Sequence, residues 1–317
     1  MIVAITGINS GLGRTLVPKL QSDPSIEKII GIDLNEYKDN PEKIEFIRVD
    51  IRDKEGMERA LNGVDVLVHL AYIVIPQKIP KLKVIYDINV NGSKTVFQAA
   101  ATNNVQKIVH LSSQSVYGHV AECPKIVTED APRLGIRTTN FYYSHTKALV
   151  EEFLDQFETD YPTISVVRLR PPIIAGPHFL QNLGLLDLSR KRRVITAATA
   201  NQNGKLPIQL IHEDDLTDVL LMAIKNMQGA YNVSSNIIPD LEEFARREYG
   251  VKIWRLPQFL VKLGIRMGRL WTKLRWAEAI LYNSLLNTEK IEQELGWKPK
   301  YSTEECIKEI NALLSQV

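Results

Sequence analysis

Residues 2–13 have the sequence IVAITGINSGLG, in which a short apolar run is followed by three closely spaced glycines. The apolar run predicts a buried strand, and the segment 12–20 predicts the helix after it. Glycines let the backbone turn tightly and approach a ligand, and the amides and dipole of a helix N-terminus attract a pyrophosphate. The turn therefore predicts a nucleotide cofactor, with contacts from Gly7, Asn9, Ser10, Gly11, Leu12 and Gly13.

A second apolar run, at 28–32, leads to Asp33, which follows Gly13 by 20 residues. A carboxylate at the end of this strand can accept hydrogen bonds from both hydroxyls of an adenosine ribose, and it repels a 2′-phosphate. Such glycine turns also serve packing alone, but here strand, helix and acid follow in the order that cofactor binding needs. We therefore predict NAD as the cofactor in preference to NADP.

Composition narrows the class of protein. The 317 residues include 39 basic and 37 acidic side chains, a formal net charge of +2, which gives no sign of a nucleic-acid partner. Cys123 and Cys306 lie far apart with no histidine at metal-ligand spacing, so we expect neither a disulfide scaffold nor a metal site. The sequence contains no long uncharged apolar segment and no secretion signal, so we expect a cytoplasmic protein with no integral membrane segment.

Apolar runs of strand length alternate with segments of helical length. The predicted strands are at 28–32, 44–49, 64–70, 107–111, 164–169 and 208–212, and the predicted helices at 53–61, 84–103 and 141–158. This alternation predicts an α/β fold with a doubly wound parallel sheet, the Rossmann fold, because crossover helices cover both sheet faces.

After Pro177 the alternation is lost, and from about residue 240 the pattern is mainly helical. We therefore predict a smaller, mainly helical C-terminal substrate subdomain. The NAD-binding domain is placed at 1–177 plus about 208–230, so that 208–212 could return to the sheet, and the substrate-binding subdomain at about 178–207 plus 231–317. The substrate should bind in the crevice between the two parts.

The segment 143–147 places a phenol, Tyr143, four residues before an ammonium, Lys147, and hence on one face of a helix. A nearby cation lowers the pKa of a phenol from about 10, which would let Tyr143 exchange a proton with a substrate hydroxyl. A lone pair at this spacing is more often an ordinary half-exposed Tyr and Lys. The order of the other motifs favours the catalytic interpretation.

Hydroxyl groups gather directly after the predicted strand 107–111, at Ser112, Ser113 and Ser115. Ligands of open α/β sheets bind at the carboxyl ends of the strands, where a serine can hold a substrate oxygen. Isolated serines commonly cap turns instead. The glycine turn, the acid, the serines and the Tyr/Lys pair arrive in the order that one sheet would need.

Together these stretches resemble an extended short-chain dehydrogenase/reductase of the NAD-dependent epimerase/dehydratase family. The resemblance covers nearly the whole chain, and the matching stretches are 6–13, 50–53, 69–71, 89–92, 112–118, 143–147, 170–177, 212–215 and 295–299. It implies that Tyr143 is the general acid/base, that Lys147 binds the nicotinamide ribose and that Ser113 holds the reacting oxygen. Ser112 and Ser115 are close competitors of Ser113.

The resemblance also implies further cofactor contacts. Asp33 would bind the adenosine ribose, and Asp50 and Ile51 would border the adenine. The cofactor path would be lined by Leu70, Ala71 and Tyr72. Asn89 would bind near the cofactor or anchor the helix that supports Lys147.

Two substrate positions depart from the family pattern, as does the spacing of the glycines. Nucleotide-sugar enzymes of this type usually have an asparagine where this chain has Ile173, and a diphosphate-binding arginine where it has Ile208. Burying a diphosphate without such partners is costly, so a nucleotide-sugar substrate loses support. The basic run Arg190 to Arg193 would supply a phosphate clamp, although such runs are more often solvated surface.

Between 258 and 274, apolar residues recur at helical spacing beside a basic stripe. The apolar positions are Phe259, Leu260, Leu263, Met267, Leu270, Trp271 and Leu274, and the basic ones Lys262, Arg266, Arg269 and Lys273. Such a helix can lie on a membrane surface, but amphipathic helices more often pack one face on the core, and we expect core packing here.

The combined pattern predicts an enzyme that transfers hydride between the nicotinamide of NAD and a secondary alcohol or ketone carbon of a small-molecule substrate. One alternative is a nucleotide-sugar epimerase or dehydratase that recycles its NAD internally. Another, of a different class, is a non-catalytic NAD-sensing regulatory protein. The resemblance also implies a homodimer formed through the predicted helices at 84–103 and 141–158.

Overall fold

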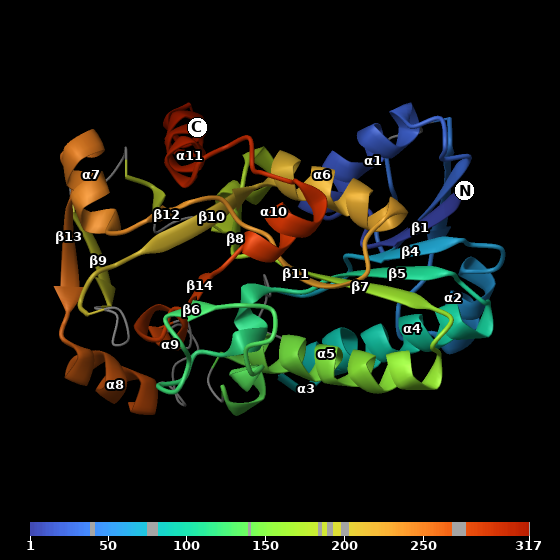
Figure 1. The fold of residues 1–317 in the computed structure, drawn as a ribbon, viewed down its shortest axis with the longest axis horizontal. Helices are drawn as coiled ribbons and strands as arrows, with labels where there is room; N and C mark the ends of the chain where they lie inside the picture. The colour runs from blue at the N-terminus through green and yellow to red at the C-terminus, as the bar shows by residue number, and fades with distance from the viewer. Residues whose placement is uncertain are drawn as a thin grey trace. The chain divides into compact units, whose positions relative to one another are not determined.

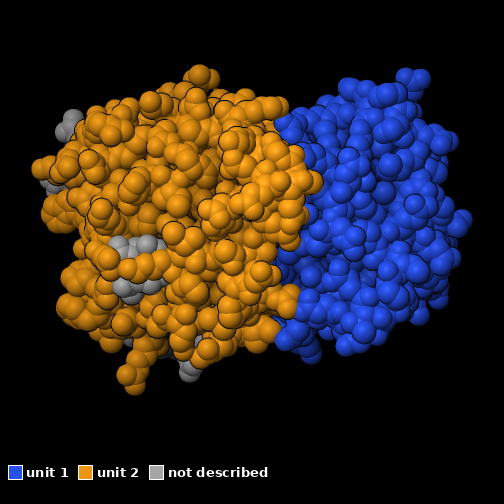
Figure 2. All heavy atoms as spheres, in the orientation of Figure 1, with its two compact units in different colours: residues 1–112, 149–170, 217–231 blue, residues 113–148, 171–216, 232–317 orange. Residues whose placement is uncertain are grey.

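The computed structural model describes residues 1–38, 42–74, 82–138, 141–182, 186–188, 193–197, 203–267 and 277–316. The chain folds as two compact units, which Figure 2 colours separately. Unit 1 comprises residues 1–112, 149–170 and 217–231, and unit 2 comprises residues 113–148, 171–216 and 232–317.

Unit 1 contains a seven-stranded sheet with the strand order β11-β7-β5-β4-β1-β2-β3. Its strands are β1 (Ile2–Thr6), β2 (Lys28–Asp33), β3 (Ile44–Arg48), β4 (Val66–His69), β5 (Lys107–Leu111), β7 (Ser165–Arg170) and β11 (Gly229–Asn232). Every pairing from β3 across to β7 is parallel. Strand β1 lies between β2 and β4, so the winding reverses beside β1, and ligands of doubly wound sheets bind at this reversal.

Helices cover both faces of this sheet, with α2, α4 and α5 on one face and α1 and α6 on the other (Figure 1). The helices are α1 (Gly11–Ser22), α2 (Lys54–Ala60), α3 (Leu82–Tyr86), α4 (Ser93–Thr102), α5 (Tyr142–Asp160) and α6 (Glu213–Lys225). Helices α5 and α6 each begin in unit 2 and end in unit 1. The core between the sheet and the α4–α5 layer includes the fully buried rings of Phe97 and Phe157. The predicted doubly wound Rossmann fold is confirmed.

Two predicted elements differ in detail. The helix predicted at 84–103 is interrupted by a π-helical turn, η1 (Asp87–Gly92), which separates α3 from α4. Residues 208–212 form a strand, β10 (Ile208–His212), but it pairs with β8 and β12 in a separate small sheet, and β11 takes the edge of the large sheet. All five β10 residues are buried. An apolar run predicts burial but does not specify which strands will be its neighbours.

Unit 2 is built from small sheets and short helices. A three-stranded sheet joins β12 (Ile237–Ile238), β10 and β8 (Ile173–Ala175), and two-stranded sheets join β13 (Lys252–Leu256) to β9 (Arg193–Ala197) and β14 (Leu285–Leu286) to β6 (Ile126–Val127). Its helices are α7 (Leu241–Tyr249), α8 (Gln258–Met267), α9 (Ala277–Leu281), α10 (Glu289–Leu295) and α11 (Thr303–Ser315), with 3-10 turns at η2 (Gln114–Tyr117), η3 (Leu134–Arg137) and η4 (Pro177–Asn182). Leu210, Phe244, Ile253 and Ile307 lie in its main core.

Unit 2 includes 113–148, 171–177 and 208–216, three segments that the sequence pattern places in the NAD-binding domain. Compactness is a separate property from independent folding, so the predicted domain boundaries stay a prediction. Within the described ranges, no helix is long and apolar enough to cross a bilayer.

Candidate active site

The turn between β1 and α1 brings its backbone close to neighbouring segments. Gly7 has a φ of +73°, and a Cβ there would lie 2.7 Å from the backbone nitrogen of Ala71. A Cβ on Gly13 would lie 2.2 Å from the carbonyl oxygen of Ile8. Ser10 caps α1, its Oγ accepting a hydrogen bond from the Gly13 amide at 3.1 Å. A side chain at either position would collide with neighbouring backbone, so this tight turn requires glycine. A glycine turn at a helix N-terminus forms a cradle that suits a phosphate.

Asp33 ends β2 with its carboxylate held by two backbone amides. Its Oδ2 accepts a hydrogen bond from the Asn9 amide at 3.2 Å, and its Oδ1 accepts one from the Asn35 amide at 3.0 Å. The Asn9 side chain is itself fixed, because its Nδ2 donates to the Asn35 carbonyl at 2.8 Å. Each carboxylate oxygen keeps a second acceptor position, which suits a pair of ribose hydroxyls. Helix α1 begins at Gly11, and the side chain of Leu12 in its first turn is buried.

The next predicted contacts, Asp50 and Ile51, follow β3. Asp50 forms an ion pair with Arg52 at 2.7 Å, and Arg52 reaches Asp87 of η1 at 3.0 Å. The hydrogen bond from the Arg52 side chain is the main reason that the pKa of Asp50 lies below its ordinary value. Ile51 is buried. Arg52 therefore connects the end of β3 to η1. In the sequence, Arg52 was marked only because it lies in the family-matching stretch 50–53.

Asn89 holds the segment that follows β4. Its side chain is fully buried, with Oδ1 accepting from the Ile73 amide at 2.9 Å and Nδ2 donating to the Ile73 carbonyl at 3.0 Å. These two hydrogen bonds to the backbone of Ile73 hold the loop that contains Leu70, Ala71 and Tyr72, three of the predicted cofactor residues. The side-chain amide of Asn89 is thus held by Ile73, and its role near the cofactor or in anchoring the helix that supports Lys147 stays a prediction.

A buried polar chain continues behind this loop. The His69 ring lies between Thr6 Oγ1 at 2.7 Å and Ser93 Oγ at 2.9 Å, and Ser93 Oγ donates to the Asn89 carbonyl at 2.6 Å. These bonds connect β1, β4 and the start of α4. The sequence marked His69 only as part of a matching stretch, since its partners are 24 and 63 residues away.

In unit 2, Tyr143 and Ser113 form a hydrogen bond. Lys147, one helical turn further along α5, is only 2% exposed, and its Nζ lies over the Tyr143 ring, 5.9 Å from the ring centre. A cation in this position is attracted by the ring face. The three residues predicted to be catalytic are thus brought together within one unit.

The electrostatic setting of Tyr143 differs from the expectation. Burial raises the pKa of Tyr143 to about 12, and the hydrogen bond with Ser113 acts in the opposite direction without reversing the shift. The net shift is opposite to the lowering expected from Lys147, because burial disfavours the charged phenolate. With this pKa, Tyr143 is a neutral phenol near neutral pH.

Geometry distinguishes the three candidate serines. Ser112 Oγ donates to Glu151 at 2.5 Å. Ser115 Oγ lies 3.4 Å from His119 Nε2. Ser113 bonds Tyr143 and also caps η2, its Oγ accepting from the Ser115 amide at 3.2 Å. Ser113 is therefore the serine placed to share an oxygen ligand with Tyr143.

Two further contacts hold the segment that contains Ser113. Ser144 Oγ donates to the Ser115 carbonyl at 2.6 Å, which ties η2 to the first turn of α5. His119 is buried against Phe141, with Nδ1 3.3 Å from the Tyr282 carbonyl, and burial lowers its pKa to about 4. His119 is thus a neutral scaffold residue at neutral pH. Sequence reasoning missed His119 because its contacts with Phe141 and Tyr282 join segments far apart in the chain.

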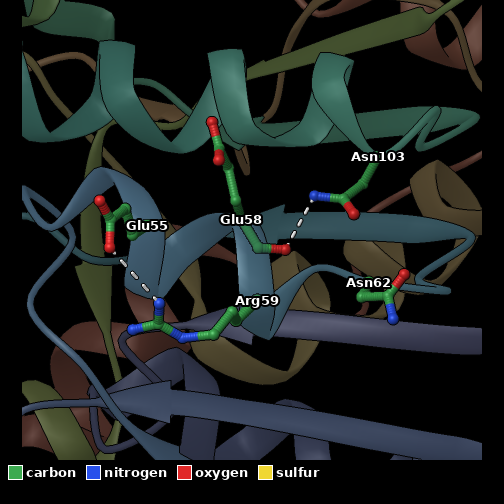
Figure 3. Close-up of a pocket in the computed structure, with 5 residues that line it drawn as sticks. All are labelled: Glu55, Glu58, Arg59, Asn62 and Asn103. Carbon is green, nitrogen blue, oxygen red and sulfur yellow. Dashed lines mark hydrogen bonds and ion pairs between the residues drawn. The ribbon is translucent and has the colours of Figure 1, made fainter.

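A depression of about 410 Å³ on unit 1 lies among Glu55, Glu58, Arg59, Asn62 and Asn103 (Figure 3). Asn103 Nδ2 donates to the Glu58 carbonyl at 2.9 Å, and Arg59 pairs with Glu55 at 3.7 Å. No lining residue belongs to the predicted cofactor or catalytic set. In the part of the chain that the structure describes, no group of three or more His, Cys, Asp or Glu side chains is placed to hold a metal ion.

The comparisons with known proteins agree with this geometry. The family model described as "NAD dependent epimerase/dehydratase family" matches residues 3–234. The chain belongs to the NAD-dependent epimerase/dehydratase family. It is accordingly an enzyme of the extended short-chain dehydrogenase/reductase type whose cofactor is NAD. The glycine cradle and the Asp33 carboxylate fit that cofactor.

Similar sequences and structures come from several organisms. UDP-glucose 4-epimerase 1 of Oryza sativa subsp. japonica is 24% identical over 296 residues, covering 86% of this chain and 79% of the relative. An uncharacterized protein of Mycobacterium tuberculosis is 25% identical over 322 residues, covering 96% and 82%. The structure of UDP-glucose 4-epimerase from Thermotoga maritima with UDP-glucose has a TM-score of 0.72 at 18% identity, covering 100% and 99%. This solved structure shares the fold of the chain.

In this family member, both departures from the nucleotide-sugar pattern lie in unit 2. Ile173 on β8 is 50% exposed, whereas Ile208 on β10 is 8% exposed. Neither side chain offers a hydrogen bond to a diphosphate or sugar. Arg190, Lys191 and Arg192 of the predicted phosphate clamp lie outside the described residues.

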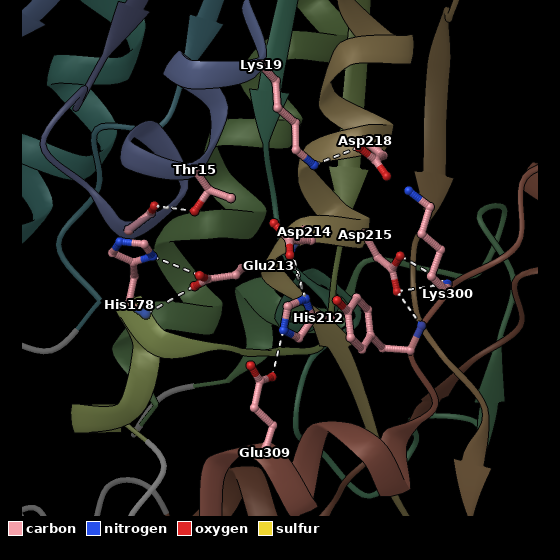
Figure 4. Close-up of polar contacts among 12 residues, drawn as sticks. Thr15, Lys19, His178, His212, Glu213, Asp214, Asp215, Asp218, Lys300 and Glu309 are labelled. Carbon is pink, nitrogen blue, oxygen red and sulfur yellow. Dashed lines mark hydrogen bonds and ion pairs between the residues drawn. The ribbon is translucent and has the colours of Figure 1, made fainter. Parts of the chain in front are cut away.

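The family stretch 212–215 has a structural role in unit 2 (Figure 4). The Asp214 amide donates to His212 Nδ1 at 3.1 Å, so Nε2 carries the proton and donates to Glu309 at 2.8 Å. Asp215 accepts hydrogen bonds from the amides of Lys300 and Tyr301, both at 3.0 Å. Next to them, Glu213 bonds the exposed imidazole of His178, at 2.8 Å.

Proposed function

We propose that this chain transfers hydride between NAD and a carbon that carries a secondary alcohol or ketone. The observation that carries the proposal is the Tyr143–Ser113 hydrogen bond, with Lys147 one helical turn away and almost fully buried. Bound NAD supplies the hydride acceptor or donor. Ser113 fixes the substrate oxygen, Tyr143 moves the proton of that oxygen, and Lys147 binds the nicotinamide ribose.

The protonation state of Tyr143 suits one direction of the reaction directly. A neutral phenol donates a hydrogen bond and then a proton to a carbonyl oxygen as that oxygen gains charge. In the reverse direction, the phenolate form must accept the hydroxyl proton, and burial opposes this form. Ser113, which bonds Tyr143, can hold the same oxygen in either direction.

Two versions of this chemistry have separate support. Ile173 and Ile208 leave no polar anchor at the two nucleotide-sugar positions, which supports a net dehydrogenase or reductase acting on a less charged small molecule. Relatives named UDP-glucose 4-epimerase, at 24% identity, support the second candidate, a nucleotide-sugar epimerase or dehydratase that returns the hydride to the same substrate.

The fate of the cofactor separates these candidates. For a net dehydrogenase, we expect protein purified without added cofactor to be largely empty, because NAD must exchange after every turnover. Denaturing the protein and identifying the released nucleotide by mass spectrometry measures this. NAD retained in near-stoichiometric amount would instead favour internal recycling, and NADP would contradict the role of Asp33.

Asp33→Asn tests the cofactor assignment. Hydrogen bonds to a charged group contribute about 1.5–3 kcal/mol, so we expect NAD to bind about tenfold to hundredfold more weakly, with NADP affected less because the repelling charge is gone. Calorimetric titration with both cofactors gives the two affinities. Glu36→Gln is the matched control, since it removes an exposed carboxylate three residues away and should leave both unchanged. An unchanged NAD affinity in Asp33→Asn would remove Asp33 from the cofactor site.

Homodimerisation through the helical segments now seen as α3, η1, α4 and α5 stays a prediction, as does a cytoplasmic location. The small-molecule substrate is proposed by chemical class only.

A further inference from the structure

Exposed apolar side chains gather on β13 and α8 of unit 2. Trp254 and Leu256 are 57% and 44% exposed, and Phe259, Leu260 and Leu263 are 68%, 43% and 52% exposed. Twelve large apolar side chains are exposed in the described part of the chain, and these five fall within ten consecutive residues. Scattered exposed apolar residues are ordinary, whereas a group of this kind marks an interaction surface.

The exposure follows the secondary structure. Strand β13 alternates, with Trp254 and Leu256 exposed and Ile253 buried, and it leads directly into α8 (Figure 1). Within α8, Val261 is buried in a small cluster with Leu281, while Phe259 and Leu263, one turn apart, are exposed. The expectation that the apolar residues of 258–274 pack on the core is therefore wrong for these positions, because α8 buries its Val261 side. Residues 268–274 lie outside the described part.

The same stretch of the chain is basic. From Val251 to Met267 the sequence contains Lys252, Arg255, Lys262 and Arg266 and no acidic residue, although the whole chain has a net charge of only +2. Arg255 pairs with Asp240 and Glu242. The other three bases are exposed, and Lys262 and Arg266 are one helical turn apart beside Phe259 and Leu263.

We propose that this β13–α8 face, formed by Lys252, Trp254, Leu256, Phe259, Leu260, Lys262, Leu263 and Arg266, binds the surface of an anionic lipid bilayer. A helix with apolar side chains on its outer face and bases beside them lies in the plane of the interface, with the apolar groups between headgroups. Aromatic side chains such as Trp254 favour this depth. The bases add attraction to negatively charged headgroups.

Charge favours the bilayer over a second copy of the chain as the occupant. A symmetric contact through this face would bring Lys262 and Arg266 of one copy toward the same bases of the other. Like charges brought together in a desolvated interface oppose binding. An anionic bilayer instead complements both the apolar and the basic parts of the face.

The test is co-sedimentation of the full chain with vesicles of phosphatidylcholine alone and with about one third phosphatidylserine. We expect binding to the anionic vesicles, at least tenfold weaker binding to the neutral ones, and a loss of binding as salt is raised. Phe259→Ser/Leu263→Ser should weaken binding at least tenfold, and so should Lys262→Gln/Arg266→Gln.

Matched controls separate surface loss from unfolding. Ile126→Ser removes another exposed apolar side chain of unit 2, 55% exposed, and Lys54→Gln/Arg59→Gln removes two exposed bases of unit 1. Both should bind vesicles as the wild-type chain does, and all variants should keep its thermal midpoint because every changed residue is exposed.

Three results would overturn the proposal: no binding of the wild-type chain to anionic vesicles, undiminished binding by Phe259→Ser/Leu263→Ser, or equal binding to neutral vesicles. Light scattering adds a fourth. Wild-type self-association that Phe259→Ser/Leu263→Ser abolishes, without any vesicle binding, would assign the face to a second copy. None of these measurements depends on the proposed hydride transfer.

Discussion

Tyr143→Phe is expected to lower kcat about a thousandfold while NAD binds with unchanged affinity. A positioned acid or base commonly contributes 10²- to 10⁴-fold, and the substitution removes only the hydroxyl that bonds Ser113. A thousandfold loss corresponds to about 4 kcal/mol of transition-state stabilisation. The measurement is steady-state turnover of a secondary alcohol or ketone that the wild-type chain accepts, together with calorimetric titration of NAD.

The neighbouring residue provides a matched control. Tyr142 precedes Tyr143 on α5 and is also partly buried, so Tyr142→Phe makes the same chemical change one position away. We expect its kcat to stay within about twofold of wild type, since no acid or base is removed. Normal turnover by Tyr143→Phe, with NAD bound as before, would instead favour the non-catalytic NAD-sensing alternative.

The raised pKa of Tyr143 gives this prediction a pH dependence. Because the folded-state pKa is about 12, the phenolate is scarce at neutral pH, and alcohol oxidation should accelerate with rising pH without a plateau near pH 7. Ketone reduction uses the neutral phenol, which is fully populated over the same range. A plateau near neutral pH in kcat/KM for oxidation would contradict the raised pKa and would mean that the Lys147 charge outweighs burial.

Local backbone requirements were the part of the site most accessible to sequence reasoning. The need for glycine at Gly7 and Gly13 arises from contacts with Ala71 and Ile8, and such close approaches leave a visible pattern of glycines beside a strand. The four-residue spacing of Tyr143 and Lys147 likewise follows from helix geometry alone. The fold and the class of cofactor follow from local features of this kind, so both could be predicted from the sequence.

Long-range pairing was not accessible in the same way. Which serine meets Tyr143 depends on where the end of β5 lies relative to α5. Only the family resemblance favoured Ser113 over its close competitors Ser112 and Ser115. The position of the Lys147 ammonium over the ring depends on packing that spacing cannot express. The outward face of α8 shows the same limit, because periodicity identifies an apolar stripe but not which side of the helix meets the core.

Another feature hidden from sequence reasoning is a buried ion pair in unit 1. Glu151 of α5 is 0% exposed and Arg170 at the end of β7 is 3% exposed. The Arg170 guanidinium donates to both carboxylate oxygens, at 2.5 and 2.9 Å, and Ser112 donates to the same carboxylate. Burial alone would raise the pKa of Glu151, but the charge and hydrogen bonds of Arg170 hold it below its ordinary value.

Glu151→Gln is therefore expected to reduce the free energy of unfolding by about 3–5 kcal/mol, because it leaves the Arg170 charge buried without its counter-charge. Urea unfolding at neutral pH measures this loss. Glu55→Gln is the surface control: its carboxylate is 85% exposed and 3.7 Å from Arg59, so the change should stay within about 0.5 kcal/mol.

The pair also predicts how the loss depends on pH and on its partner. Because the folded-state pKa of Glu151 is lowered, its stabilising contribution is present above the ordinary value of 4.5 and is lost as pH falls through the folded-state value. The difference in the free energy of unfolding between wild type and Glu151→Gln should be constant from about pH 6 to 8 and should shrink in acid.

A double variant tests whether the two charges are coupled. Glu151→Gln/Arg170→Met removes both charges while keeping an acceptor for Ser112, and we expect it to be more stable than Glu151→Gln. A double variant that is less stable by the sum of both single losses would show that the two charges are not coupled, and the ion pair would then not be the source of the stability.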